Sequence, residues 1–154
     1  MRIAFAADHG GAELKDELLA RLRAESSPHE LIDLGGDGSD PTDDYPEYAV
    51  RVGRAIQTEA ADRGVLVCGS GVGASVAASK MKGIRASVCH DTYSAHQGVE
   101  HDDLNVLCLG GRIVGIELAL DIVRAYAGAS FSNEPRHRRR VDEVRAIEAA
   151  ERRA

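Results

Sequence analysis

Residues 65–73 have the sequence Val65-Leu66-Val67-Cys68-Gly69-Ser70-Gly71-Val72-Gly73, and this stretch decides the fold. A short apolar run ends in a cysteine, and the chain then passes through a glycine-rich turn into alanine-rich sequence. This order predicts a strand, a turn and the start of a helix. Such a turn directs backbone N–H groups toward one point, beside the positive end of the helix dipole. The stretch therefore predicts an anion site with a thiol at its lip.

The same order of apolar run, turn and amphipathic helix recurs along the chain. Strands are predicted at 2–7, 30–34, 65–68, 84–89 and 105–109, with a long irregular stretch at 35–46 that we expect to be functional. A helix is predicted at about 92–100, and apolar residues at helical spacing mark the others: Leu14, Leu18 and Leu22; Tyr48, Val52 and Ile56; Ile113, Ile116, Leu120 and Val123; and Val141, Val144 and Ile147 in a final helix from about Pro135 to the end. We therefore expect a single Rossmann-like α/β domain over residues 1–154, with a five-stranded parallel sheet, helices on both faces and a C-terminal helix.

Composition narrows the class of protein. The 154 residues are 44% hydrophobic and 29% charged, which is typical of a globular domain. We expect no membrane span, because no apolar run approaches the roughly 20 residues that one needs, and no secretory signal precedes the first strand. The three cysteines fit a reducing cytoplasm better than a disulfide framework. The net charge of -6 argues against a general nucleic-acid surface.

Reactive or flexible residues follow the predicted strands. In open α/β sheets, ligands bind at the carboxyl ends of the strands, near the point where the strand order reverses. We therefore expect an acid, a thiol, a hydroxyl, imidazoles and a guanidinium to converge on one rim of the sheet. These residues are Asp8 and His9, Cys68 and Ser70, Cys89 and His90, and Gly110-Gly111-Arg112.

Several of these residues also fit a purely structural interpretation. Cys68 is alternatively a small buried hydrophobic residue, although the adjoining glycine turn and helix start favour its thiolate. His9 is alternatively a helix cap, and His101 a surface residue at a helix end. Tyr45 is either an ordinary packing residue or a lid over the site, and the sequence does not separate the two.

Three other kinds of site fit the chain less well. The pattern Gly69-x-Gly71-x-x-Ala74 matches a loose dinucleotide fingerprint, but it follows the third strand rather than the first. A phosphatase-type cysteine loop would need an arginine where Ala74 stands. A metal site is suggested by His96 and Glu100 on one helical face, near His90 and His101, but that helix has no His-x-x-x-His pair.

A basic cluster lies near the C-terminus. Arg136 and Arg140 are one helical turn apart and present two guanidinium groups on one face. The guanidinium fork suits phosphate oxygens, whereas the structural alternative is a solvated basic helix. RNA binding is less favoured, because no aromatic residues alternate with the arginines.

Taken together, these motifs resemble the ribose-5-phosphate isomerase type B family, which includes galactose-6-phosphate and allose-6-phosphate isomerases. The resemblance runs almost end to end. It is carried by Ala7-Asp8-His9-Gly10-Gly11, Asp44-Tyr45-Pro46, Cys68-Gly69-Ser70-Gly71-Val72-Gly73, residues 101–105, Gly110-Gly111-Arg112 and residues 136–141. The cysteine-glycine loop combined with the C-terminal arginines is specific, whereas either one alone is weak.

The resemblance implies interconversion of an aldose and a ketose phosphate, most simply ribose 5-phosphate and ribulose 5-phosphate, without a metal or an organic cofactor. It implies that Cys68 is the base that moves a proton through a cis-enediolate, and that His101 opens the sugar ring. Ser70 and the backbone N–H groups of Gly69, Gly71, Val72 and Gly73 would hold the oxyanion. Asp8 would contact a sugar hydroxyl, and His9, Arg112, Arg136 and Arg140 would bind phosphate. The family's site lies at a dimer interface with the arginines crossing over, so a homodimer, which could pair into a tetramer, is implied.

Two positions depart from the family pattern, and a third distinguishes its branches. Ser70 stands where many relatives carry threonine, which preserves the hydroxyl. Asp102 stands where many relatives carry an asparagine that contacts substrate, and an ionised carboxylate accepts hydrogen bonds but cannot donate them. The preferred sugar is therefore open among four-, five- and six-carbon phosphates. Ala74 stands where another branch has a glutamate base, so Cys68 is left to act.

Overall fold

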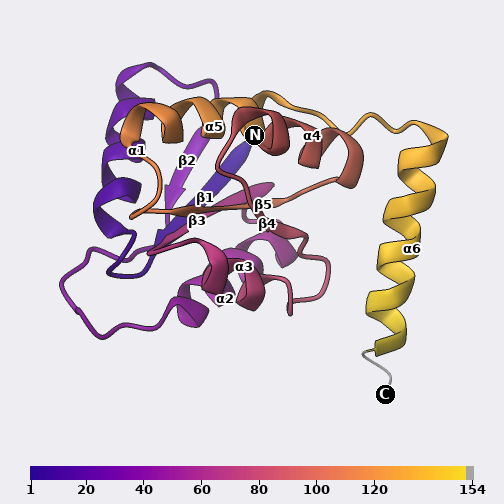
Figure 1. Cartoon of the computed structure of the whole chain (residues 1–154), viewed down its shortest axis with the longest axis horizontal. Coiled ribbons are helices and arrows are strands. Elements are labelled where there is room, and N and C mark those ends of the chain that lie inside the picture. The colour runs from indigo at the N-terminus through magenta and orange to yellow at the C-terminus, as the bar shows by residue number, and fades with distance from the viewer. Residues whose placement is uncertain (152–154) are drawn as a thin grey trace.

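Five short apolar segments form one parallel sheet in the computed structural model, which describes residues 1–151 (Figure 1). The strand order is β2-β1-β3-β5-β4, and every neighbouring pair is parallel. The predicted five-stranded parallel sheet is thus confirmed. The strands are β1 (Arg2–Ala7), β2 (Glu30–Asp33), β3 (Arg63–Cys68), β4 (Ala86–Val88) and β5 (Val106–Gly110).

Helices cover both faces of the sheet, and side chains of alternate strand residues pack against them. Phe5 and Val67 lie in the core beneath α1 (Ala12–Ala24), α4 (Thr92–Asp102) and α5 (Ile116–Gly128). Leu66 and Cys68 lie in the core of the opposite face, beneath α2 (Tyr45–Gln57) and α3 (Val72–Ala78). Figure 1 shows these two layers above and below the sheet. Both faces are therefore buried, as a parallel sheet requires.

The last helix, α6 (Pro135–Glu151), stands apart from the sheet, at the end of an extended segment that follows α5 (Figure 1). Its first turns bury His137 and Val141, and Glu148 accepts a hydrogen bond from the N–H of Gly83 at 3.0 Å. Val144 and Ile147, predicted to form an apolar packing side with Val141, are instead 52% and 64% exposed. The predicted extension of this helix beyond Glu151 lies outside the described residues.

Several element boundaries differ from the sequence prediction by one or two residues, and those of β4 and α5 differ by more. β4 has three residues rather than the six of 84–89, because only residues 86–88 pair with β5. α5 begins at Ile116, so Ile113 lies in the preceding turn with 59% of its surface exposed. The pattern of apolar residues does not show where the backbone hydrogen bonds between neighbouring strands end. Within residues 1–151, no helix is both long and apolar enough to cross a membrane.

The order in which strands are added to the sheet reverses between β1 and β3. The chain leaves β1 toward β2 on one side and returns to β3 on the other, which opens a crevice at their carboxyl ends. Gly11 and Gly36 bring two turns against this edge: a Cβ at Gly11 would overlap the carbonyl of Val67, and one at Gly36 would overlap the carbonyl of Ala7. The floor of the crevice is therefore made of closely packed backbone.

Replacing Gly11 tests whether this crowding is structural. Gly11→Ala places a methyl group against the Val67 carbonyl and within 2.8 Å of the Cys68 nitrogen, both of which are backbone atoms that cannot turn aside. We expect the free energy of unfolding to fall by about 1–3 kcal/mol, measured by urea denaturation. Gly115→Ala is the matched control, because nothing lies within 4 Å of its Cβ position. Equal stability of the two variants would contradict the crowding.

Candidate active site

Cys68 ends β3, and the loop after it folds back over the thiol. The side chain lies at the edge of the core and only 4% of the residue is exposed. The N–H of Gly71 donates to the Cys68 sulfur at 3.1 Å. Gly71 has φ +80°, a left-handed conformation that glycine adopts without strain. The loop therefore holds a backbone hydrogen-bond donor against the Cys68 sulfur.

Further donors line the same loop. The N–H of Val72 points to the Ser70 hydroxyl oxygen at 3.3 Å. Within residues 1–151, the N–H groups of Ser70 and Gly73 make no hydrogen bond. Unpaired backbone donors beside a thiol are suited to hold an oxygen that gains negative charge during a reaction.

The turn after β5 brings Arg112 to this loop. The N–H of Gly111 donates to the Cys68 carbonyl at 2.7 Å, and the N–H of Arg112 donates to the Gly69 carbonyl at 3.0 Å. The guanidinium lies over Gly69, since a Cβ built there would sit 3.5 Å from its Nη1. Two neighbouring strand ends thus place a guanidinium beside the thiol loop, at the rim where the sequence predicted it.

Tyr45, the first residue of α2, lies against the other side of the loop. A Cβ at Gly73 would sit 2.7–3.0 Å from three carbons of the tyrosine ring, so the ring packs on that glycine. Tyr45 remains largely exposed. The ring therefore packs on the loop, and a role for Tyr45 as a lid over the site stays a prediction.

Asp8 and His9 follow β1 and complete the rim. The carboxylate of Asp8 is 7% exposed and accepts a hydrogen bond from the N–H of Gly10 at 2.9 Å. Its pKa is raised, mainly because burial penalises the charged form. A Cβ at Gly10 would sit 3.1 Å from the nitrogen of Gly69, so this turn lies directly beside the thiol loop.

His9 does not cap α1, whose N-cap is Gly11 without a side-chain hydrogen bond. Its Nδ1 lies 2.7 Å from a carboxylate oxygen of Asp43, and this hydrogen bond is the main cause of the raised pKa of His9. Sequence reasoning missed Asp43. The only signal was its place in the acidic run that begins the Asp44-Tyr45-Pro46 motif, and the sequence does not show that this loop folds back onto β1.

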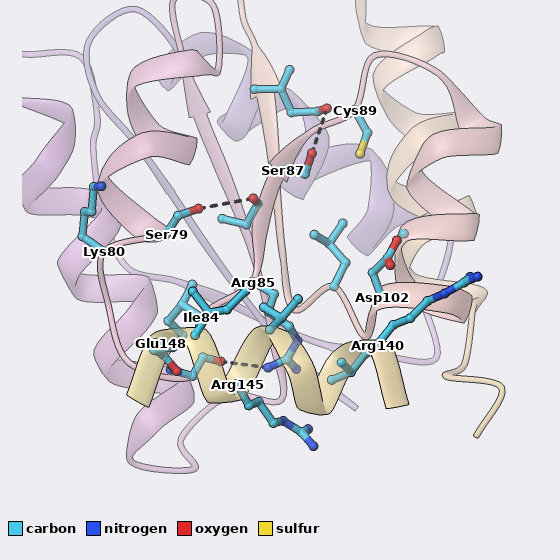
Figure 2. A pocket seen from close by; sticks show the side chains of 18 of the residues that line it. Ser79, Lys80, Ile84, Arg85, Ser87, Cys89, Asp102, Arg140, Arg145 and Glu148 are labelled. Atoms are coloured by element: carbon cyan, nitrogen blue, oxygen red, sulfur yellow. Dashed lines mark hydrogen bonds between the residues drawn. The ribbon is translucent and has the colours of Figure 1, made fainter. Parts of the chain in front are cut away.

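A second group of predicted residues lies at the end of α4 and the start of α6. The rings of His101 and His137 are stacked, with centroids 4.0 Å apart and an interplanar angle of 27°. Arg136 is exposed and pairs with Glu134 at 3.0 Å. Asp102 and Arg140 line one end of a groove of about 950 Å³ between α6, α4 and β4 (Figure 2). The structure thus brings His101, Asp102, Arg136 and Arg140 into one neighbourhood.

The two groups are separate within one chain. The first contains Asp8, His9, Tyr45, Cys68, Ser70, the loop glycines and Arg112; the second contains His101, Asp102, Arg136 and Arg140. In the described part of the chain, no hydrogen bond, ion pair or ring contact joins them. The groove lies along β4 and α6 and is not lined by Cys68.

The remaining polar residues near the strand ends have structural partners. The N–H of Gly110 donates to Nε2 of His90 at 3.0 Å, which ties the end of β4 to β5. Burial raises the pKa of the thiols of Cys89 and Cys108. His96 lies 3.7 Å from Glu100, and residues 1–151 contain no cluster of three or more His, Cys, Asp or Glu side chains that could hold a metal ion.

Comparison with known proteins shows the family to which the chain belongs. The family model described as Ribose/Galactose Isomerase matches residues 3–144. The chain belongs to this family. It is 47% identical over 147 residues to ribose-5-phosphate isomerase B of Escherichia coli, with 96% of each chain covered. It is also 36% identical to D-erythrulose-4-phosphate isomerase 2 of Mycolicibacterium smegmatis, over 97% of this chain and 99% of that protein.

Solved structures of the ribose/galactose isomerase family have the same fold. The structure of ribose-5-phosphate isomerase B from Mycoplasma genitalium with bound ribulose-5-phosphate superposes with a TM-score of 0.88 at 35% identity, and 96% of each chain is covered. The family resemblance inferred from the motifs is therefore confirmed, together with the Rossmann-like fold and the class of enzyme, an aldose–ketose isomerase.

The raised pKa of Asp8 has a consequence for stability. The folded chain binds the Asp8 proton more tightly than the unfolded chain, so the ionised carboxylate opposes folding at neutral pH. Asp8→Asn keeps the oxygen that accepts from Gly10 and removes the buried charge, so we expect its free energy of unfolding at pH 7 to exceed that of the parent.

The difference in the free energy of unfolding between Asp8→Asn and the parent should become smaller as the pH falls through the pKa of Asp8, because the parent carboxyl is then neutral as well. Urea denaturation at pH 7 and at pH 4 measures this difference. Asp44→Asn, at an exposed carboxylate of the same rim, is the control and should change stability by less than about 0.5 kcal/mol. A less stable Asp8→Asn at pH 7 would show that the charge is compensated.

Proposed function

We propose that this chain interconverts ribose 5-phosphate and ribulose 5-phosphate, with Cys68 as the base and without a cofactor. The observation that carries the proposal is the hydrogen bond from Gly71 to the Cys68 sulfur within a loop that also presents unpaired N–H groups. A base and a set of oxyanion donors side by side are what proton transfer next to a carbonyl needs.

The proposed reaction moves one proton between two neighbouring carbons. The Cys68 thiolate removes the proton from C2 of the open aldose, the C–H electron pair forms the C1–C2 double bond, and the carbonyl electron pair moves onto O1. Ser70 and the N–H groups of the loop hold the resulting cis-enediolate. The Cys68 thiol then returns the proton to C1, while the hydroxyl proton of O2 passes to O1 to give the ketose.

The other residues would recognise the sugar and its phosphate. His101 acts as the acid–base for ring opening, because pentose phosphates are mostly cyclic in water. Asp8, Tyr45 and Asp102 line the sugar, and His9 and Arg112 bind phosphate on the side of the thiol. Arg136 and Arg140 supply the remaining guanidinium groups, whose fork matches phosphate oxygens.

The separation of the two groups of residues supports a homodimer with the site between the subunits. Cys68 and Arg112 lie on the rim of the sheet, whereas His101 lies at the end of α4 and Arg140 on α6, and no hydrogen bond, ion pair or ring contact within residues 1–151 joins the two pairs. In the proposed dimer, the end of α4 and the start of α6 of one chain bring the second group to the Cys68 loop of its partner. The three unpaired cysteine thiols fit the reducing cytoplasm as the compartment.

A second sugar is favoured by a specific observation. D-erythrulose-4-phosphate isomerases are among the relatives, and Asp102 replaces the asparagine expected at a substrate contact. A panel of four-, five- and six-carbon sugar phosphates would identify the preferred one. The rival from another class is a module that binds a sugar phosphate or a nucleotide without turnover, and it predicts no isomerisation of any member of the panel.

Cys68→Ala tests the base. We expect kcat to fall by about 10²–10⁴, because the proton at C2 then has no acceptor. Turnover is measured as formation of ribulose 5-phosphate from ribose 5-phosphate. Cys89→Ala is the matched control: Cys89 is equally buried, burial raises its pKa, and activity should stay near that of the parent. Near-parental activity of Cys68→Ala would show that Cys68 is not the base.

Subunit mixing tests the shared site. Cys68→Ala and Arg140→Ala chains are each expected to be inactive as homodimers, but a mixed dimer contains one site with both native residues. Half of the dimers formed from equal amounts of the two chains are mixed, and each has one intact site of two. Unfolding and refolding the mixture should therefore restore about a quarter of the parental activity.

Parental chain carried through the same procedure is the control for refolding yield. If Cys68 and Arg140 act in the same chain, mixing restores nothing, and the interface proposal fails while the assignment of the base stands.

A further inference from the structure

Asp43 holds His9 at two points. One oxygen of its carboxylate, Oδ1, accepts hydrogen bonds from both the backbone N–H of His9 at 2.8 Å and the ring Nδ1 at 2.7 Å. The other oxygen, Oδ2, accepts from the hydroxyl of Tyr48 at 2.7 Å. The Asp43 side chain is only 9% exposed, so these bonds have little competition from water. The carboxylate therefore fixes the backbone and the ring of His9 at once.

This arrangement is not a helix cap. The N-cap of α2 is Asp44, which makes no side-chain hydrogen bond to the helix, and both oxygens of Asp43 are directed elsewhere. The nearby loop carboxylates behave differently. Asp37 and Asp40 accept from the N–H groups two residues ahead, at 2.9 Å each, and so form local turns. Asp43 alone of these three reaches across to β1.

The contact decides what His9 can offer a ligand. An ionised carboxylate only accepts hydrogen bonds, so Nδ1 carries a proton, and Nε2 is left without a partner among the described residues. Hydrogen bonding to Asp43 raises the pKa of His9, and the nearby charge of Asp8 acts in the same direction. A protonated ring presents Nε2–H, a charged donor suited to a phosphate oxygen, whereas a neutral ring presents a bare acceptor.

Tyr48 keeps Asp43 ready for this role. Burial alone would disfavour the charged form of Asp43, but the hydrogen bonds from His9 and Tyr48 outweigh it and lower the pKa of Asp43. The same contact raises the pKa of Tyr48 to about 12, so its hydroxyl remains a donor. The titratable groups that act on His9 are thus Asp8 from the end of β1, Asp40 and Asp43 from the loop, and Tyr48 behind Asp43.

We propose that Asp43 is the positioning residue of His9: its carboxylate holds the imidazole through Nδ1 and the backbone N–H, so that Nε2 is directed to the phosphate of the substrate as a hydrogen-bond donor. The part that concerns phosphate rests on the proposed function. The part that concerns the Asp43–His9 pair does not, and the two parts are tested separately.

The pair is tested without turnover by NMR titration of ¹⁵N-labelled imidazoles. Loss of the His9 signals in His9→Gln assigns them among the six histidines. In Asp43→Asn the midpoint of the His9 titration should move to lower pH, because the amide no longer stabilises the imidazolium. Asp40→Asn, the matched control, removes one charge from the same loop and leaves the bond intact, so the midpoint should move much less. An equal shift in the two variants would overturn the proposal.

The role at phosphate is tested by the pH dependence of KM. Above its lowered midpoint, His9 in Asp43→Asn is neutral while the parental ring is still charged, so KM for ribose 5-phosphate should rise by about tenfold with kcat nearly unchanged. Below both midpoints the two rings carry the same charge, and the gap in KM should close. A gap that is independent of pH would indicate a structural defect alone and would overturn this part.

A conservative variant guards against misfolding. Asp43→Glu retains the carboxylate, so it should recover part of both the His9 midpoint and KM, whereas a failure to recover either would contradict a role for the charge. The outcomes remain separable from the proposed function. If activity survives in Cys68→Ala, Cys68 is not the base, but the NMR evidence for the Asp43–His9 pair still holds. If the His9 midpoint is unchanged in Asp43→Asn, Asp43 is not the positioning residue, but the proposed mechanism still holds.

Discussion

The close approach of backbone at the carboxyl edge of β1, β3 and β5 is the constraint on which the rest of the site depends. Turns from three parts of the chain meet there, and Gly11, Gly36 and Gly111 each lie where a Cβ would meet the backbone of a neighbour. Because side chains are excluded, peptide groups form the floor of the crevice. Their N–H groups are fixed donors that need no reorganisation when charge develops nearby. Cys68 is the last residue of β3, so its thiol lies directly beside these backbone donors.

This constraint explains why the sequence predicts where one group of the candidate residues lies. Parallel strands buried on both faces appear as short apolar runs, and the residue after each run must lie at the same edge of the sheet. Asp8, Cys68 and Arg112 could therefore be placed from the pattern alone. His9 could be placed too, but its partner Asp43 could not. Asp43 is brought to His9 by an irregular loop, and nothing in local propensity or periodicity encodes the path of such a loop across the sheet.

The other failures of prediction have a related cause. The helix periodicity of Val141, Val144 and Ile147 is real, but periodicity does not say whether a partner is present, and only Val141 is buried by the described residues. The short edge strand β4 likewise ends where pairing ends, not where apolar residues end. Sequence patterns report the local conformation of a segment, whereas burial depends on what the rest of the molecule places against it.

In the proposed site, positively charged arginines on α6 lie away from the acidic rim around Cys68. The rim around Cys68 holds the carboxylates of Asp8 and Asp43, and Arg112 is the one arginine that the turns of this rim place beside the thiol loop in the described part of the chain. Arg140 lies on α6, away from that rim, and makes no ion pair within residues 1–151. In the proposed dimer its charge meets the rim only when two copies associate. Binding energy from the phosphate, at the far end of the substrate from the reacting carbons, then orients C1 and C2 beside the base. In the proposed mechanism the thiol loop is therefore left for proton transfer and oxyanion stabilisation, because other elements supply most of the phosphate ligands.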